Sequence, residues 1–455
     1  MKSDESFEQD VRASLRASAP RQVPEDLVVR IAAIPVEEPA SGGVRGLHLF
    51  ARSAVNLAAA AIVVVVVAAL IISRNGVNVS VGGLPNGSPS VAAPVVTPSS
   101  ATPAPAASPS PSSPAAGPSA VPALGLSPAS VTFVSANDGW VLGKATCASG
   151  QCAAIARTAD GGRTWVAVRA PDAPIFPSPS DASPGISELR FADADNGWAF
   201  GPDLWSTHDG GTTWVRQTIP GVAAGPNVAA LGTAGGTVYA VVFDGGAYRV
   251  ASSPIGSDAW TLGAVRVPVG AGPVPTIQLI LQGGAGWLLE NDRTVVAGAR
   301  LVNGAWVTWQ PPSSTVVGPA FLTASGPRDL AAACDVGLWS NPTGEHLFLS
   351  HDGGSTFTES ATAVPLTMGA MAAAASPSVI VVGGSDGTGA ILVATFDAGQ
   401  SWSVVARLGS VQIADLGFTT PTQGVVVAAG ANGPATLLMT RDGGHTWSPV
   451  RQAGS

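Results

Sequence analysis

The sequence predicts an all-β fold, a seven-bladed β-propeller, carried on a proline-rich stalk behind one N-terminal transmembrane helix. Three observations lead to this prediction. One eight-residue turn pattern recurs five times along the C-terminal part of the chain. Short apolar stretches of strand length separate the turns, and helix signals are absent there. An uncharged apolar stretch of 19 residues, Ala54 to Ile72, precedes this region.

Composition excludes several classes of protein. The chain has 455 residues, of which 11% are charged, with 55 Gly and 38 Pro. It is too apolar for a disordered chain and too often broken by Gly and Pro for a helical bundle. The net charge of −8 opposes binding to phosphates, so no nucleic-acid partner is expected.

Residues 54–73 are predicted to cross the membrane. About 20 helical residues span a bilayer core, and a helix forms there despite the β-branched centre because it satisfies its own backbone polar groups. A cleaved signal peptide is the alternative. It fits less well, because a charged leader of 53 residues precedes the stretch and the apolar run is long for a signal peptide.

Basic residues near the ends of this stretch predict its orientation. The N-terminal side carries Arg45 and Arg52, whereas Arg74 is the only basic residue on the other side before Lys144. Basic flanks stay in the cytoplasm. Residues 1–53 are therefore expected to form a cytoplasmic tail of a single-pass, bacterial-type cell-membrane protein, with everything after the helix extracytoplasmic.

Residues 74–129 are predicted to form an extracytoplasmic linker. From about Leu84 to Pro128 the chain is built mostly from Pro, Ser, Ala, Thr and Val and carries no charge. Such a segment is extended and partly stiff, and it cannot bury a core. Its Ser-Pro and Thr-Pro content is suited to O-glycosylation, which composition alone does not establish.

Residues 130–455 contain the repeated turn, with the pattern S/T-x-D-x-G-x-S/T-W/F. Its Asp and aromatic residues are Asp160 and Trp165, Asp209 and Trp214, Asp352 and Phe357, Asp397 and Trp402, and Asp442 and Trp447. The interval from Trp214 to Phe357 is about three times the others, so two decayed copies are expected, near Trp260 and Trp309. Seven units of about 47 residues, each with four strands, predict a seven-bladed propeller.

Physical chemistry suggests a structural role for the repeated turn. The Asp accepts backbone N–H groups, the Gly residues supply positive φ, and the hydroxyls satisfy further local groups. The closing aromatic is expected to be buried, at Trp165, Trp214, Trp402 and Trp447. A catalytic or calcium-binding role for these Asp residues is disfavoured, because five equivalent sites around a ring do not form one active site.

Ring closure is predicted to use both ends of the domain. An open ring leaves sheet edges unpaired, and only eight residues follow Trp447. Blade seven is therefore expected to be completed by an N-terminal strand near Val131, lying beside the C-terminal one.

The cysteines and histidines predict no metal site. Cys147 and Cys152 could close a small hairpin disulfide in an oxidising compartment, and Cys334 is left as a buried small apolar residue. The histidines of the repeats lie in different copies, at His208, His351 and His445. No metal and no cofactor are expected.

At these residues the sequence resembles the BNR/Asp-box repeat proteins, which include sialidases, sortilin-type receptors and some glucanases. The pattern Phe133…Asn137-Asp-Gly-Trp140 followed by Thr158-x-Asp-Gly-Gly-x-Thr-Trp165 is most similar to the photosystem II assembly and stability factor propellers. The resemblance covers about residues 130–451. It implies a seven-bladed propeller whose Asp-box turns lie at the periphery, away from a central binding face.

The leading functional hypothesis is a non-catalytic binding or assembly scaffold, with a protein or glycan partner on the propeller face. A sialidase-like glycoside hydrolase is the alternative. Such an enzyme needs an arginine triad and a Tyr–Glu pair, whereas Tyr239 and Tyr248 are the two Tyr in the chain. A paired-carboxylate site stays open, with candidates Glu188, Glu290, Glu345 and Glu359. A third hypothesis is a single-pass receptor signalling through residues 1–53.

Overall fold

The computed structural model describes residues 125–450, apart from gaps at 148–149, 176–184, 223–224, 271–275, 292–294, 311–319, 336–343 and 431–434. The predicted tail, the transmembrane helix and nearly all of the linker lie outside the described residues. Within the described part, no helix is long and apolar enough to cross a membrane. The described residues form seven four-stranded antiparallel sheets.

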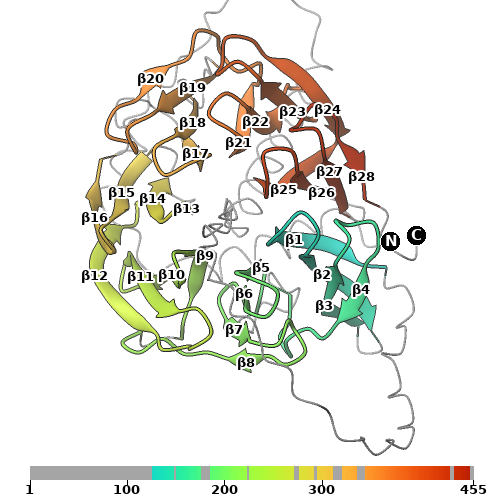
Figure 1. Ribbon diagram of the computed structural model, residues 1–455, viewed down its shortest axis with the longest axis vertical. Helices are drawn as coiled ribbons and strands as arrows, with labels where there is room; N and C mark the ends of the chain where they lie inside the picture. Colours follow the sequence, from blue (N-terminus) through green and yellow to red (C-terminus); the bar gives the residue numbers. More distant parts are fainter. Residues whose placement is uncertain are drawn as a thin grey trace, which may run out of the picture. The chain divides into compact units, whose positions relative to one another are not determined.

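The seven sheets form the blades of a propeller, as the sequence predicts, and each blade is a meander of four consecutive strands (Figure 1). Blades one and two are β1 (Ser127–Phe133), β2 (Gly139–Cys147), β3 (Gly150–Thr158), β4 (Val166–Val168), and β5 (Glu188–Phe191), β6 (Gly197–Phe200), β7 (Leu204–Thr207), β8 (Val215–Arg216). Blades three and four are β9 (Val228–Ala234), β10 (Thr237–Asp244), β11 (Ala247–Pro254), β12 (Thr261–Pro268), and β13 (Thr276–Gln282), β14 (Ala285–Asn291), β15 (Val295–Val302), β16 (Ala305–Trp309). Blades five and six are β17 (Ala320–Ala324), β18 (Leu330–Asp335), β19 (Glu345–Ser350), β20 (Thr358–Glu359), and β21 (Met368–Ala374), β22 (Ile380–Ser385), β23 (Ala390–Thr395), β24 (Ser403–Gly409). Blade seven is β25 (Val411–Phe418), β26 (Gly424–Gly430), β27 (Thr436–Thr440) and β28 (Ser448–Pro449).

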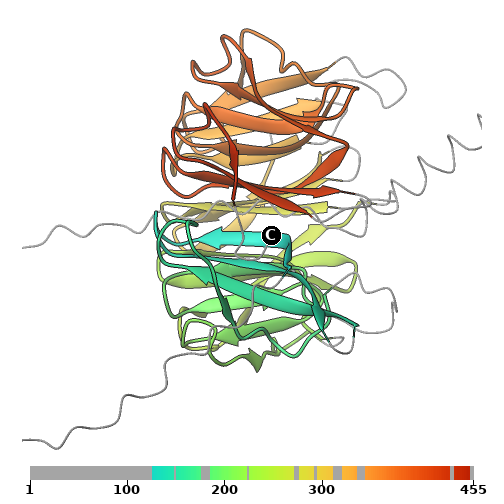
Figure 2. The ribbon, with the colours of Figure 1, turned by 90° about the vertical axis from the view of Figure 1, so that its right-hand side faces the viewer.

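The meander gives the ring two different faces. The first strand of each blade lies nearest the centre and the fourth at the rim (Figure 1). Because successive strands are antiparallel, the turns joining strands one to two and three to four lie on one face, which we call the Asp-turn face. The hairpins joining strands two and three, and the connections between blades, lie on the other, which we call the loop face (Figure 2).

The prediction that both termini complete blade seven is wrong. Blade seven is built from β25 to β28, all from the C-terminal end, and β1 is the innermost strand of blade one. Two residues, Ser448 and Pro449, are enough for a rim strand, since only Leu438 and Met439 pair with them. Blades one and seven meet through side chains instead, among them Val131, Phe133 and Trp165 of blade one.

The prediction that the closing aromatics are buried holds only for Trp165. That side chain is 7% exposed, whereas Trp214, Trp402 and Trp447 are half-buried at the rim. The fully buried indoles belong to second strands: Trp140 in β2, Trp198 in β6 and Trp287 in β14. Second strands lie inside the blade, between the neighbouring sheets, so large apolar residues there lose more contact with water than those beside a two-residue rim strand.

The two decayed copies differ from each other. Trp260 directly precedes the rim strand β12 and is buried, as Trp165 precedes β4. Trp309 instead ends its rim strand, so it does not occupy the place of a turn aromatic. Its indole N–H donates to the carbonyl of Gly354 in the next blade at 2.8 Å. The turn of blade four is a two-residue Asn303-Gly304 hairpin, both residues with positive φ.

Candidate functional site

The five intact repeats form one closed hydrogen-bonded turn, which we call the Asp turn. In blade two, Thr207 Oγ1 donates to Asp209 Oδ1 at 2.8 Å, and Thr213 Oγ1 donates to Asp209 Oδ2 at 2.6 Å. The backbone N–H of Thr213 also donates to Asp209 Oδ1, and that of Gly211 donates to Thr207 Oγ1. The same four bonds recur around Asp160, Asp352, Asp397 and Asp442.

These bonds hold the Asp residues in the ionised form. The closing hydroxyl, together with its own backbone N–H, lowers the pKa of Asp160, of Asp209 and of Asp397 to about 2. A general acid needs a carboxyl pKa near the working pH. The turn carboxylates are therefore suited to locking a turn and are unsuited to donating a proton at neutral pH.

Each Asp turn is fastened to the other turn of its own blade. The N–H of the residue after the Asp donates to a carbonyl in the turn between strands one and two, as in Gly210 to Asp195 at 2.9 Å. In all five blades with an Asp turn, that partner turn has five residues. In blades three and four it is a two-residue Gly-Gly turn, at Gly235-Gly236 and Gly283-Gly284. The Asp turn and the five-residue turn therefore occur together. In blade three the short turn still meets the other turn of its blade, since the Gly236 carbonyl accepts the N–H of Ile255 at 3.0 Å.

The histidines of the Asp turns do not converge. His208 contacts Asn196 and Asp258, His351 contacts Asp329, and His445 stacks on Phe396 with ring centroids 3.7 Å apart. Among the described residues, no three His, Cys, Asp or Glu side chains are grouped as metal ligands.

Ionisable residues are almost absent from the seven inner strands. The three that occur are Glu188 and Arg190 on β5 and Asp415 on β25. They lie together, with Arg190 Nη1 3.7 Å from Asp415 Oδ2 and Arg190 Nη2 3.5 Å from Glu188 Oε2. The Arg190 and Asp415 side chains are less than 10% exposed. Glu188 is one of the candidates that the sequence predicts, whereas Arg190 and Asp415 are not, because they are far apart in the chain and no local motif marks them.

The cluster connects three blades. Asp415 Oδ2 of blade seven accepts the N–H of Val131 in blade one, at 3.2 Å. Arg190 Nη1 and the N–H of Leu189, both in blade two, donate to Ser130 Oγ in blade one, each at 3.2 Å. Burial raises the pKa of Asp415, and the Arg190 guanidinium opposes that rise. The guanidinium is thus bound within the protein, where it stabilises the ring.

The contact from Asp415 to Val131 is one case of a more general arrangement. Polar side chains on one inner strand bond the backbone N–H groups of the next. Thr132 Oγ1 accepts from Phe191, Gln278 Oε1 from Leu322, and Thr323 Oγ1 from Ala374. Such bonds satisfy backbone groups that the inner edge of a sheet would otherwise leave unpaired.

Of the Tyr and Glu candidates for a hydrolase, Tyr239, Tyr248 and Glu290 belong to blades three and four. Desolvation by burial raises the pKa of Tyr248 to about 12, and the charge of Glu290 adds to the rise. A raised pKa makes the phenolate less accessible, the opposite of what an activated nucleophile needs. Glu290 Oε1 accepts the N–H of Gly270, and Tyr239 packs edge-on against Trp306. Glu345 similarly accepts the N–H of Gly369, in the next blade, and Glu359 pairs with His346 at the rim.

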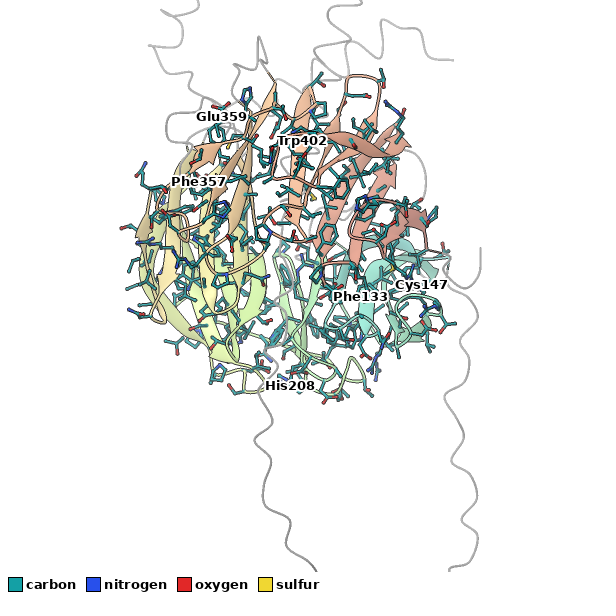
Figure 3. All side chains as sticks on the ribbon, turned by 45° about the horizontal axis from the view of Figure 1, so that its top comes forward. Phe133, Cys147, His208, Phe357, Glu359 and Trp402 are labelled. Atoms are coloured by element: carbon teal, nitrogen blue, oxygen red, sulfur yellow. A yellow bond between two sulfur atoms is a disulfide. The ribbon has the colours of Figure 1, made fainter. Side chains whose placement is uncertain are left out.

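The loop face is irregular where the Asp-turn face is regular. The connections between blades range from residues 169–187, between β4 and β5, to Ser410 alone, between β24 and β25. The β2–β3 hairpin carries the Cys147–Cys152 disulfide, with Cα atoms 6.0 Å apart (Figure 3). Cys334 is buried, as predicted. A variable set of loops on a uniform scaffold is typical of a binding surface.

The chain is similar to solved structures only at low sequence identity. No protein-family model matches the sequence, and no curated protein matches it. Among solved structures, YCF48 bound to D1 peptide is 16% identical, covering 70% of this chain and 95% of that one, with a TM-score of 0.48. The propeller domain of the trilobed protease from Pyrococcus furiosus, described as having an open velcro topology, is 7% identical, covering 71% and 95%, with a TM-score of 0.47. The GH74 enzyme of Niastella koreensis is 14% identical, covering 71% and 65%, with a TM-score of 0.38. These similarities concern the fold and identify no ligand.

Proposed function

We propose that this protein is a binding or assembly scaffold without catalytic activity, and that its loop face contacts a protein or glycan partner. The observation that carries the proposal is the difference between the two faces. The Asp-turn face repeats one hydrogen-bonded pair of turns in five blades. The loop face changes from blade to blade, and loops held on a rigid scaffold are where binding residues concentrate.

The state of the ionisable groups supports binding over hydrolysis. Arg190 is the one arginine of the inner strands, and it is bound to Asp415, Glu188 and Ser130. A sialidase-like site needs three guanidinium groups directed at the substrate carboxylate. The raised pKa of Tyr248 also disfavours the nucleophile that such an enzyme uses.

We further propose that the five Asp turns place the chain with the BNR/Asp-box proteins. The sequence pattern and the four recurrent bonds around each Asp support this assignment. We also propose that residues 54–73 anchor the chain in the membrane, with residues 74–129 as an extracytoplasmic linker. The Cys147–Cys152 bond is consistent with an oxidising compartment, where such bonds persist.

Site-specific photo-crosslinking from the two faces tests the binding proposal. A crosslinking amino acid would be placed at Gln151 or Thr388 on the loop face, and at Thr212 or Gln400 on the Asp-turn face, all of which are exposed. The full chain expressed in its membrane should crosslink one partner from the loop-face positions only. Crosslinks from the Asp-turn positions alone would contradict the proposal. Turnover of fluorogenic glycosides that disappears in Tyr248→Phe would favour the hydrolase instead.

Protease treatment of intact cells tests the anchor. It should remove the region after Arg74 and leave residues 1–53 intact, since the membrane protects the cytoplasmic side. A propeller that resists protease in intact cells but not in lysed cells would reverse the proposed orientation.

A further inference from the structure

We infer that the outer edge of β16 binds an extended segment of the same chain, Val77 to Val81, as an added strand. β16 (Ala305–Trp309) is the rim strand of blade four and lies at the outside of the ring (Figure 1). One of its edges pairs with β15, and among the described residues no strand or backbone group pairs with the other edge. An unpaired edge of this kind is a template for pairing with another length of chain.

The other six rim strands have the features with which proteins protect a sheet edge. Four of them, β4, β8, β20 and β28, have only two or three residues. β12 contains the charged Arg266, ends in Pro268 and has a register shift in its pairing with β11. β24 contains Arg407 and has two register shifts in its pairing with β23. Short strands, charges, prolines and β-bulges all discourage the pairing of a free edge.

β16 has none of these features. Its sequence, Ala-Trp-Val-Thr-Trp, contains no charge and no proline, and its pairing with β15 runs without a shift over all five residues. β12 packs against the face that carries Trp306, but the two strands are not hydrogen-bonded to each other. Val307 lies on the opposite face of the strand and is 40% exposed. β16 is therefore a regular, uncharged edge built from residues that favour strands.

The occupant is argued from the sequence between the predicted membrane helix and the proline-rich part of the linker. Residues 77–81 are Val-Asn-Val-Ser-Val, with Gly76 before them and Gly82-Gly83 after them. Strict alternation of apolar and polar residues between glycines is typical of a strand with one apolar face. From Arg74 to the start of the described residues, this is the one proline-free stretch with the pattern, and its five residues match the length of β16.

The side chains of the segment suit the exposed face of β16. An added strand draws affinity from main-chain hydrogen bonds and specificity from alternate side chains. With the three valines of the segment on the face of Val307, that half-exposed side chain gains apolar neighbours across the strands. Asn78 and Ser80 then lie on the same face as Thr308, which is exposed and polar.

The linker is long enough for this contact. Residues 82–124 separate the segment from blade one, and they cover about 130 Å when extended at about 3.1 Å per residue. A domain of this size has a radius of gyration of about 20 Å, so every rim strand is within reach. Since Val77 follows closely after Arg74, the docked segment would hold the rim of blade four near the membrane. That consequence rests on the proposed anchor, whereas the docking itself does not.

Photo-crosslinking from Val307 tests the docking in the full chain, solubilised in detergent. A photoreactive phenylalanine analogue in place of Val307 should attach to a fragment that contains residues 77–81, identified by mass spectrometry after digestion. Val215 is the matched control position, because it is 60% exposed on the two-residue rim strand β8, and it should not capture the segment. In a mixture of nitrogen-14 and nitrogen-15 chains, the crosslink should join residues of one chain.

A proline substitution in the segment gives a second measurement that leaves the seven sheets unchanged. Val79→Pro should reduce the capture from position 307 by about fivefold or more, because proline removes an N–H donor from the added strand. Val96→Pro, in the proline-rich part of the linker, is its matched control and should leave the capture unchanged.

Three results would overturn the proposal. Capture of residues 311–319 would mean that the next connection covers the edge, capture between a light and a heavy chain would mean that a second copy covers it, and no capture would mean that it stays open. Equal capture in Val79→Pro and Val96→Pro would also count against an added strand. None of these results affects the loop-face crosslinks from Gln151 and Thr388, so the proposed function is tested separately.

Discussion

Phe191, the last residue of β5, pairs with Gly197, the first residue of β6, and a Cβ on Gly197 would lie 2.5 Å from the Phe191 ring. Gly197 is therefore required, because any larger residue would clash with the Phe191 ring. The same pair recurs next to the five-residue turns of two other blades, as Phe133 with Gly139 and Phe418 with Gly424. In blades five and six the small residue lies on the first strand and the large one on the second, with Ala324 opposite Leu330 and Ala374 opposite Ile380.

Gly197→Ala is expected to destabilise the propeller by about 1–3 kcal/mol, because the added methyl group overpacks a filled site. Gly417→Ala is the matched control, since Gly417 also lies in a strand but a Cβ there meets nothing within 4 Å. Chemical unfolding of the two variants measures the difference. Equal stabilities would show that the Phe191 ring moves aside at no cost.

The exchanged pairs suggest a rescue for this position. Phe191→Ala alone should cost about 3–5 kcal/mol, because its ring stacks on Trp140 at 3.8 Å between centroids. Adding Gly197→Leu recreates the arrangement of blades five and six, so the double variant should be more stable than Phe191→Ala. If the double variant loses as much stability as the two single variants together, or more, the two side chains do not fill the same space.

Thr395→Val should destabilise the protein by about 1–3 kcal/mol, because it leaves buried groups without partners. Thr395 is fully buried, and its hydroxyl donates to Asp397 Oδ1 at 2.8 Å and accepts the N–H of Gly399 at 2.7 Å. Thr395→Ser keeps the hydroxyl, as Ser350 does in blade five, and should cost much less. Denaturant unfolding distinguishes them, and an equal loss in both would attribute the effect to the methyl group.

Acid should weaken the Asp turns in a defined pH window. The folded pKa of Asp160, Asp209 and Asp397 is about 2, against about 3.9 for an unfolded Asp. Their contribution to the free energy of unfolding is complete above about pH 4 and is lost as pH falls through about 2. In that range the unfolded chain binds protons that the folded chain does not. Melting temperature measured from pH 5 to pH 2 should fall less steeply in Asp209→Asn than in wild type. A parallel fall would assign acid unfolding to other carboxylates.

Arg190→Met should destabilise the ring by about 3–5 kcal/mol, because it leaves buried carboxylates without their counter-charge. Asp415→Asn added to this variant should recover part of the loss, since the Asn oxygen still accepts the N–H of Val131. Calorimetry of both variants tests the idea. No recovery in the double variant would mean that Arg190 acts by filling space rather than by charge.

The Asp turns were the part of the fold most open to prediction from sequence. Each is local, within eight residues, so the hydrogen bonds around Asp209 or Asp442 depend on a pattern that can be read along the chain. Counting these patterns predicts seven blades, and the seven sheets confirm it.

Contacts between blades were not predictable in the same way. The full burial of Trp140 and the partial burial of Trp402 depend on whether the residue lies inside a blade or at its rim, and the residues themselves do not show this. Arg190, Ser130 and Asp415 meet only because the ring closes. The strand-exchange hypothesis failed because a rim strand of two residues, β28, is shorter than any strand the sequence pattern would suggest.

The absence of an exchanged strand makes every blade one uninterrupted stretch of chain. Consecutive blades are joined by one connecting segment of chain, and blades seven and one are the one neighbouring pair not joined in this way. Blades one and seven are held by Asp415, by Arg441 of the last Asp turn, which donates to the carbonyl of Gly161 at 2.6 Å, and by apolar packing. The chain is therefore modular in the genetic sense: a unit of one blade can be duplicated, deleted or moved from one end to the other without cutting a sheet.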